Sequence, residues 1–279
     1  MDPFSSTKET CAGENNMEST IPVVLLCGGA GTRLREETQF MPKPMVAIGN
    51  RPTLWHIMKI YDHYGFKKFI ICLGYKGEMI KEYFMHYKMM NNDITVKLGA
   101  KEEIEIHNGH SCDDWQITLS DTGTKALKGA RIKRIEKYID SEIFMVTYGD
   151  GVADINIQKL LEFHVSHGKI ATVTGVRPKF LKFGELNIEE DRVTRFTEKP
   201  AYKGNYVNGG FFVFNRKLFD YLDDKDECEL EADPLTRISS EGELMVYKHN
   251  GFWACMDTIR DTEYLNGLWK NNQAAWKVW

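Results

Sequence analysis

The sequence predicts an α/β fold, with a doubly wound, mainly parallel, Rossmann-like sheet and a mixed or antiparallel extension. Short apolar runs recur along the chain and alternate with amphipathic segments. Each run is apolar on consecutive positions, which is typical of strands covered on both faces. The runs are Val23–Cys27, Phe69–Leu73, Ile143–Tyr148 and Ile170–Val176. Strands that alternate with helices favour parallel pairing within one sheet.

Two segments between these runs predict crossover helices. The first begins after Pro52 and ends at Gly65, and its apolar face is formed by Leu54, Ile57, Met58 and Tyr61. The second runs over Ile157–His167 and stops at Gly168, with one face formed by Leu160, Leu161 and His164.

The later part of the chain predicts strands separated by turns, which favours antiparallel or mixed pairing. These strands are expected at Phe196–Pro200, Val207–Phe214 and Glu243–His249, and we expect them to cover the substrate. The chain closes on a predicted helix and tail that carry Leu268, Trp269, Trp276 and Trp279. So dense an aromatic terminus is typical of packing, within one subunit or against another, rather than of a cofactor site.

The length of 279 residues allows one α/β domain or two smaller ones, and the composition favours a small-molecule substrate. Residues 1–16 are polar and predict a disordered tail or an added extension, and residues 17–279 predict a single domain. The net charge of −4, from 36 basic and 40 acidic residues, gives no general attraction for nucleic acid or for anionic membranes. No apolar run is long enough to cross a bilayer and no signal-like segment opens the chain, so we expect a soluble, cytoplasmic protein.

Cysteines and histidines give little sign of disulfides or of a metal centre. The six cysteines are scattered without a Cys-x-x-Cys pair, which favours free thiols. His107, His110 and Cys112 lie close together in sequence and are candidate metal ligands. Their stretch is polar and no second half matches it elsewhere, so a solvated loop is favoured.

The segment Leu25–Leu34 (LLCGGAGTRL) predicts a phosphate-binding loop. The loop contains three glycines, Gly28, Gly29 and Gly31. Because glycine has no side chain, the backbone N–H groups at these positions can approach an anion closely. Arg33, and Lys43 in the following PKPM motif, add positive charge. The spacing lacks the Gly-Lys-Ser/Thr of a Walker loop, and Leu34 stands where a dinucleotide fingerprint has its third glycine. The pattern indicates a nucleotide-handling enzyme, against the alternative of an ordinary strand-to-helix turn.

Two carboxylates are candidates for a metal site. Asp150, in the motif YGDG, follows a buried strand and so lies at the carboxyl edge of the sheet, where open α/β folds bind ligands. One carboxylate there suits a hard divalent cation that bridges phosphate oxygens, and the alternative is a turn in which Asp150 bonds local N–H groups. Asp257, in FWACMDTIRD, is either a second metal ligand or the N-cap of the following helix.

Two further motifs suit a second substrate. Lys199, in the motif EKP, extends from the edge of a strand and is able to bind an anion, although an isolated lysine is commonly a solvated surface residue. Asn208, in the motif NGG, offers an amide beside an open backbone, which suits either hydrogen bonds to sugar hydroxyls or a turn.

Together these motifs resemble the sugar-1-phosphate nucleotidylyltransferase family. The resemblance rests on the order and spacing, from Ile21 onward, of GGAGTRL, PKPM, YGDG, FGELNI, FTEKP, VNGGFFVF and MDT. The cytidylyltransferase branch, which uses CTP and glucose 1-phosphate, is resembled by WHIMKIYDHYG, CLGYKGEMIKEYF, TLSDTG and GLWKNNQAAWKVW. The resemblance implies a homo-oligomeric enzyme with a nucleotide-binding half at about 21–175, a sugar-binding part at about 176–260, and a C-terminal helix and tail at 261–279.

The resemblance also implies roles for individual residues. The nucleotide would be bound by Leu26, Cys27, Gly28, Gly29, Ala30, Gly31, Thr32, Arg33, Lys43, Arg131 and Gly149, with the segment Thr124–Lys128 beside the base. The sugar phosphate would be bound by Glu198, Lys199, Asn208 and Gly209. Mg²⁺ would be held by Asp150 and Asp257.

The expected reaction needs no protein nucleophile. A sugar-1-phosphate oxygen would attack the α-phosphorus of CTP in line, expelling pyrophosphate and leaving CDP-glucose. The barrier lies in bringing two anions together and in the charge that grows on the leaving group, so the catalytic residues would be Arg33, Lys43, Asp150 and Lys199. The alternatives are an enzyme that uses UTP or dTTP, and a catalytically silent binding or regulatory relative, which would have lost a metal carboxylate or a phosphate-binding cation.

Overall fold

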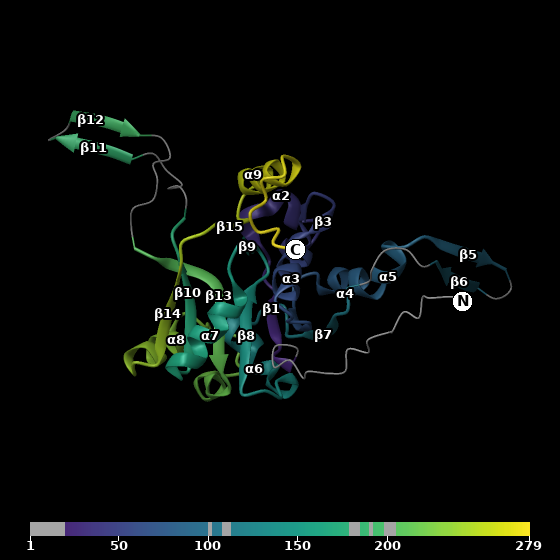
Figure 1. Ribbon diagram of the computed structural model, residues 1–279, viewed down its shortest axis with the longest axis horizontal. Coiled ribbons are helices and arrows are strands. Elements are labelled where there is room, and N and C mark those ends of the chain that lie inside the picture. Colours follow the sequence, from purple (N-terminus) through teal and green to yellow (C-terminus); the bar gives the residue numbers. More distant parts are fainter. Residues whose placement is uncertain (1–19, 100–101, 108–112, 179–184, 190–191, 198–204) are drawn as a thin grey trace, which may run out of the picture.

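A seven-stranded sheet forms the centre of the computed structural model, which describes residues 20–99, 102–107, 113–178, 185–189, 192–197 and 205–279 (Figure 1). The strand order is β14-β10-β13-β8-β1-β4-β7. In that order the strands are Leu244–His249, Ala171–Val176, Val207–Asn215, Ile143–Tyr148, Val23–Leu26, Lys68–Leu73 and Gln116–Asp121. The predicted tail at 1–16 lies outside the described residues.

Parallel pairing dominates this sheet and confirms the predicted fold class. Strand β1 pairs in parallel with both β4 and β8, and β4–β7 and β10–β14 are parallel as well. Only β13 among these strands runs the other way, between β8 and β10. The mixed pairing expected of the later part of the chain is therefore carried by β13, inside the sheet, and by the antiparallel hairpin of β11 (Glu185–Glu189) and β12 (Arg192–Thr197).

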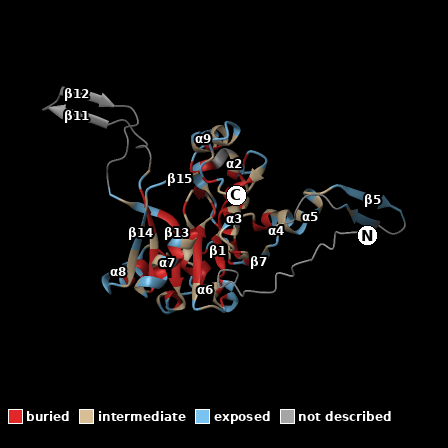
Figure 2. Cartoon of the chain, in the orientation of Figure 1, coloured by how far each residue is buried: buried red, intermediate tan, exposed pale blue. Residues whose placement is uncertain are grey.

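Side chains alternate along β1 between two cores, one on each face of the sheet. In Figure 2 the central strands are mostly red, which marks buried residues. Val24 is in register with Ile70 and Val146, and all three belong to the core that α6 (Lys128–Arg134) and α8 (Asp233–Ser240) cover. Val23 and Leu25 belong to the opposite core, with α3 (Thr53–His63), α7 (Ile157–His167) and α9 (Ile259–Lys270). Cover on both faces explains why the strands are apolar on consecutive positions.

Both predicted crossover helices are present. The four apolar residues expected on one face of α3 are all buried, and Gly65 follows the helix with φ +86°. Helix α7 has the predicted bounds, and Gly168 closes it with φ +62°, a conformation that favours glycine. The remaining helices are α2 (Arg35–Thr38), α4 (Gly77–Met85) and α5 (Tyr87–Met90). Three short antiparallel pairs complete the chain: β2 (Ala47–Ile48) with β3 (Arg51–Pro52), β5 (Ile94–Leu98) with β6 (Glu102–Ile106), and β9 (Gly151–Ala153) with β15 (Trp253–Cys255).

The aromatic C-terminus packs within the subunit, against His56 on α3. We call this group the aromatic cluster; it consists of Trp55, His56, Trp269, Trp276 and Trp279. Trp276 is fully buried, and its Nε1 donates to His56 Nδ1 over 3.4 Å. His56 Nε2 in turn lies 2.9 Å from the carbonyl oxygen of Ile48. Across the described residues, no helix is long and apolar enough to span a membrane.

Candidate functional site

A cavity of about 450 Å³ lies at the carboxyl ends of β1 and β8. These strands are neighbours in parallel register, so the segments that follow them, the glycine-rich loop and the motif at Tyr148–Gly151, meet at one edge of the sheet. Most of the residues predicted for the site line this cavity, namely Leu26, Cys27, Gly28, Gly29, Gly31, Arg33, Lys43, Arg131, Gly149, Asp150 and Asn208.

Two glycines of the loop are required by its geometry. Gly31 has φ +61°, in the left-handed region that favours glycine. A Cβ atom on Gly28 would lie 2.0 Å from an Nη atom of Arg131, so a larger residue would displace the Arg131 guanidinium. Gly28, Gly29 and Gly31 all line the cavity, so an anion bound there would lie beside backbone that carries no side chain.

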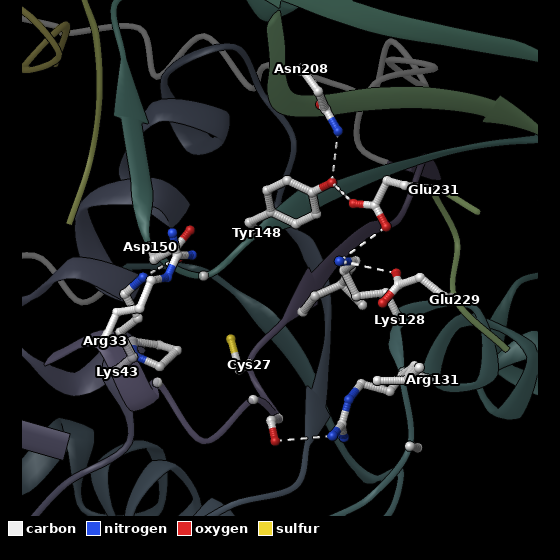
Figure 3. Close-up of a pocket in the computed structure, with 18 residues that line it drawn as sticks. Cys27, Arg33, Lys43, Lys128, Arg131, Tyr148, Asp150, Asn208, Glu229 and Glu231 are labelled. Atoms are coloured by element: carbon white, nitrogen blue, oxygen red, sulfur yellow. Dashed lines mark hydrogen bonds and ion pairs between the residues drawn. The ribbon is translucent and has the colours of Figure 1, made fainter. Parts of the chain in front are cut away.

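One end of the cavity carries fixed charges of both signs. Lys43 Nζ lies 2.6 Å from Asp150 Oδ2 and 2.7 Å from Asp257 Oδ1. Arg33 Nη1 lies 2.9 Å from the other oxygen of Asp257. We call these four residues the charged end, and Figure 3 labels three of them, Arg33, Lys43 and Asp150. Both carboxylates therefore converge on one cation, the ammonium group of Lys43.

Pairing of β9 with β15 brings the two carboxylates together. Gly151 is in register with Cys255, and the N–H of Met256 donates to the carbonyl oxygen of Asp150 over 2.9 Å. The N-cap of α9 is Thr258, which forms a capping box with Asp261. Asp257 is thus not the N-cap, and its side chain is directed into the site.

Burial governs the protonation of the residues at this end. Burial opposes the charge of Lys43, but attraction by Asp150 and hydrogen bonds to both carboxylates overcome it, so the pKa of Lys43 is raised. Burial raises the pKa of the Cys27 thiol well above its usual value. Lys43 is therefore charged and Cys27 protonated near neutral pH.

Arg131 supports the glycine-rich loop from beneath. Its Nη2 donates to the carbonyl oxygen of Gly28 over 3.0 Å, and its Nη1 donates to the carbonyl oxygens of Leu73 and Gly123 over 2.9 Å and 2.8 Å. The side chain is buried and lines the cavity, so it fixes the position of the loop that a nucleotide would contact.

The other end of the cavity brings two glutamates that the sequence did not single out together with residues from three predicted motifs. Lys128 Nζ lies 3.0 Å from carboxylate oxygens of both Glu229 and Glu231. Tyr148 donates to Glu231 and accepts from Asn208 Nδ2 over 2.9 Å. We call these five residues the polar wall (Figure 3). Three of them had a sequence signal: Tyr148 opens the motif that contains Asp150, Asn208 belongs to the motif NGG, and Lys128 ends the segment Thr124–Lys128.

The other predicted residues have varied positions. Ala30 and Thr32 belong to the loop without lining the cavity, and the carbonyl oxygen of Gly209 accepts from Trp253 Nε1 over 2.8 Å. Asn208 makes the local turn contact, because its Oδ1 accepts from the N–H of Gly210 over 2.9 Å. Its amide nitrogen donates to Tyr148, and its role in sugar binding stays a prediction. Glu198 and Lys199 lie outside the described residues.

The candidate ligands at 107–112 and the cysteines are described only in part. His107 is exposed and within 2.8 Å of Thr95 Oγ1, while His110 and Cys112 lie outside the described residues. Within the described ranges no cluster of three or more metal-ligating side chains occurs. Cys27, Cys72, Cys228 and Cys255 are free thiols.

Comparison with known sequences gives the same family across the chain. Residues 22–274 match the family model described as nucleotidyl transferase. The glucose-1-phosphate cytidylyltransferase of Salmonella typhi is 48% identical over 257 residues, which is 92% of this chain and 98% of that protein. A probable glucose-1-phosphate cytidylyltransferase of Bacillus subtilis is 44% identical over 256 residues, 92% of this chain and 99% of that protein.

Solved structures share the fold at low sequence identity. A putative glucose-1-phosphate thymidylyltransferase from Bacillus anthracis, crystallised with sucrose, aligns with a TM-score of 0.64 at 18% identity, covering 89% of this chain and 94% of that one. A UDP-glucose pyrophosphorylase in complex with UDP-glucose aligns with a TM-score of 0.64 at 14% identity, covering 90% and 99%. At such identities the likeness establishes the fold.

Proposed function

Since the chain belongs to the nucleotidyl transferase family, we propose that it transfers the cytidylyl group of CTP to glucose 1-phosphate, forming CDP-glucose and pyrophosphate. The alignments with relatives named for this activity span nearly the full length of both proteins, so the similarity extends over the whole catalytic unit. The observation that carries the proposal is the position of Lys43 between Asp150 and Asp257, beside the glycine-rich loop. The chain is an enzyme of nucleotide-sugar biosynthesis.

Mg²⁺ is the metal that suits this site. Asp150 and Asp257 already share one ammonium group, so their oxygens are directed at a single cation. Mg²⁺ commonly takes one or two carboxylates and completes its octahedron with phosphate oxygens and water. Asp150 and Asp257 would hold it, and the bound ion would neutralise phosphate charge.

Direct attack by the sugar phosphate suits the residues around the cavity. Cys27 is the thiol that lines it, and burial keeps that thiol protonated, so it is a poor nucleophile. Burial and the neighbouring Glu231 raise the pKa of Tyr148 as well. A phosphate monoester is itself an anionic nucleophile, and positioning it in line with the leaving group supplies much of the catalysis.

Positive side chains would bind the two anions. Arg33 and Lys43 would bind the phosphates that leave as pyrophosphate, with loop N–H groups holding the rest of the triphosphate. By the family resemblance, Lys199 would bind the acceptor phosphate, with Glu198, Asn208 and Gly209 around the sugar. The polar wall carries two carboxylates and one ammonium group, so it suits the uncharged, hydrogen-bonding parts of the substrates.

We also propose a single catalytic domain over 17–279, with its nucleotide-binding half at about 21–175 and its sugar-binding part at about 176–260, since one family model spans 22–274. A location in the cytoplasm is supported by the free thiols, which are typical of a reducing compartment.

A homo-oligomer is supported by the hairpin β5–β6, which extends from the body in Figure 1. Val96 is in register with Ile104, so one face of the hairpin is apolar, and the two side chains are 45% and 52% exposed. A two-stranded ribbon with an exposed apolar face is marginal unless something packs on it. We therefore propose that a second copy covers this face, and light scattering of the Val96→Lys variant tests it. A smaller particle is expected, and an unchanged mass would contradict the assignment.

The test of the function is a panel assay of pyrophosphate release. The protein is incubated with Mg²⁺ and each nucleoside triphosphate in turn, against several sugar 1-phosphates. Release with CTP and glucose 1-phosphate is expected. Release with UTP or dTTP alone would transfer the assignment to another branch, release without a sugar would indicate hydrolysis, and no release at all would indicate a silent relative.

A further inference from the structure

The ammonium group of Lys43 occupies the place between the two carboxylates that a metal would need. Its Nζ is 2.6 Å from Asp150 and 2.7 Å from Asp257. Mg²⁺ binds carboxylate oxygens at roughly 2.0–2.1 Å, so an ion shared by these two oxygens would overlap the ammonium group. The lysine and the metal therefore exclude each other at this position.

The charges of the site favour the lysine while no substrate is bound. Arg33 and Lys43 balance Asp150 and Asp257, so the charged end is neutral as it stands. The side chain of Lys43 is only 10% exposed and that of Asp257 only 8%. Displacing Lys43 without another acceptor would leave a buried ammonium group unpaired, which is strongly unfavourable.

A nucleoside triphosphate supplies the missing acceptor. Lys43 lies against the glycine-rich loop, because a Cβ atom on Gly31 would be 3.2 Å from the Cβ of Lys43. Phosphates bound by the loop would thus lie within reach of the lysine side chain, and their oxygens can replace the carboxylates as its partners.

We propose that Lys43 is an internal counter-ion that holds Asp150 and Asp257 together and keeps them closed to divalent metal until a nucleoside triphosphate draws the ammonium group away. Metal and nucleotide then bind with positive coupling, and each raises the affinity for the other by the same factor. Before the reaction Lys43 is a positioning residue for the metal carboxylates. The inference rests on the proposed function, because it takes these carboxylates as the metal ligands.

The test measures Mn²⁺ binding by electron paramagnetic resonance, with no turnover. Free wild-type protein is expected to bind Mn²⁺ weakly, and the unreactive analogue α,β-methylene-CTP should tighten binding by tenfold or more. In Lys43→Met the free protein should bind Mn²⁺ on the order of tenfold more tightly than wild type, because the competing cation is gone. The effect of the nucleotide analogue on Mn²⁺ affinity should shrink correspondingly.

Two variants separate this competition from a general effect of charge. Lys43→Arg keeps a cation between the carboxylates and should retain the weak Mn²⁺ binding of free wild type. Arg33→Met removes a positive charge that contacts only one of the two carboxylates, so its effect should be less than threefold. Thermal unfolding of each variant establishes that it is folded.

Equal Mn²⁺ affinities of free wild type and free Lys43→Met would overturn the inference, as would tight binding to free wild type. If the panel assay detects CDP-glucose while these affinities are equal, only the inference on Lys43 fails. If no nucleotide transfer is detected, the proposed function fails, whatever the affinities are.

Discussion

The segment Met256–Thr258 connects the charged end to the aromatic cluster. Ion pairs form the charged end, whereas packed aromatic rings form the cluster. Asp257 directs its carboxylate to Lys43 and Arg33, while the helix that follows it carries Trp269 into the aromatic cluster. Buried ion pairs give up hydration and contribute little net stability, whereas buried aromatic rings contribute much. Within a short stretch of sequence, this chain therefore carries both a residue of the functional charged end and a residue of the stabilising aromatic cluster.

Trp276→Ala tests the stabilising role of the aromatic cluster. We expect it to change the free energy of the protein more than the other substitutions below. Trp276 is fully buried and stacks on Phe252 with ring centroids 5.4 Å apart. Its loss should lower the free energy of unfolding by about 3–5 kcal/mol. Urea denaturation measures this, with Tyr264→Ala, an exposed aromatic, as the control. A loss below 1 kcal/mol, or a specific activity that falls tenfold in the folded fraction, would erase the distinction.

Asp150→Asn tests the functional role of the charged end. The amide keeps the shape of the carboxylate but loses its charge toward Lys43, so kcat should fall on the order of a hundredfold or more. Arg33→Ala is expected to act alike. Steady-state kinetics with CTP and glucose 1-phosphate measure the loss, and Asp114→Asn, at a 94% exposed side chain, is the control. A decrease below threefold would contradict the role of the charged end.

Acidification should weaken the aromatic cluster. Burial lowers the pKa of His56 to about 4, below its ordinary value of 6.5, because the ring is held neutral. The unfolded chain then binds the proton more readily, so the contribution of His56 to stability is fully present above pH 6.5 and is lost as the pH falls toward 4. Between pH 7 and 5 this amounts to about 2 kcal/mol.

The measurement is urea unfolding of wild type and His56→Gln at both pH values. The pH dependence should be flatter in the variant, while His86→Gln, at an exposed histidine, serves as the matched control. Equal slopes for wild type and His56→Gln would assign the acid sensitivity to another group, such as the buried His164.

Glu231→Gln tests whether the polar wall takes part in substrate recognition. We expect a smaller effect than that of the substitutions above. The substitution keeps the size of the side chain but weakens the charged hydrogen bonds to Tyr148 and Lys128, which should lower kcat/KM about tenfold. Varying CTP and glucose 1-phosphate separately shows which substrate the polar wall contacts. Glu227→Gln, at an exposed neighbour, is the control, and a change below twofold for both substrates would exclude the wall from recognition.

Local patterns predicted the scaffold and the charged end because each is encoded within a few residues. Gly65 and Gly168 mark the ends of two amphipathic runs, and the glycines after β1 mark the loop. Asp257 was ambiguous between metal ligand and N-cap. The capping box of Thr258 excludes the N-cap, and the role of Asp257 as a metal ligand stays a prediction. The pairing of β9 with β15, which joins segments far apart in sequence, brings Asp257 close to Asp150.

The two glutamates of the polar wall had no comparable signal. Glu229 and Glu231 belong to no predicted motif, and each looks like an ordinary surface residue until the fold brings Lys128 and Tyr148 against them. For the aromatic residues of the C-terminal tail, the sequence pattern predicted packing but did not show which residues they contact. Their partner is His56 of the same chain.

The central claim is that the sugar phosphate attacks CTP directly, without a covalent intermediate on the protein. The stereochemical course at the α-phosphorus tests this most directly, using CTP in which one non-bridging α-oxygen is replaced by sulfur. A single in-line displacement inverts the phosphorus, so we predict inversion in the CDP-glucose formed. Retention would require two displacements, and hence a protein nucleophile, and would contradict the account.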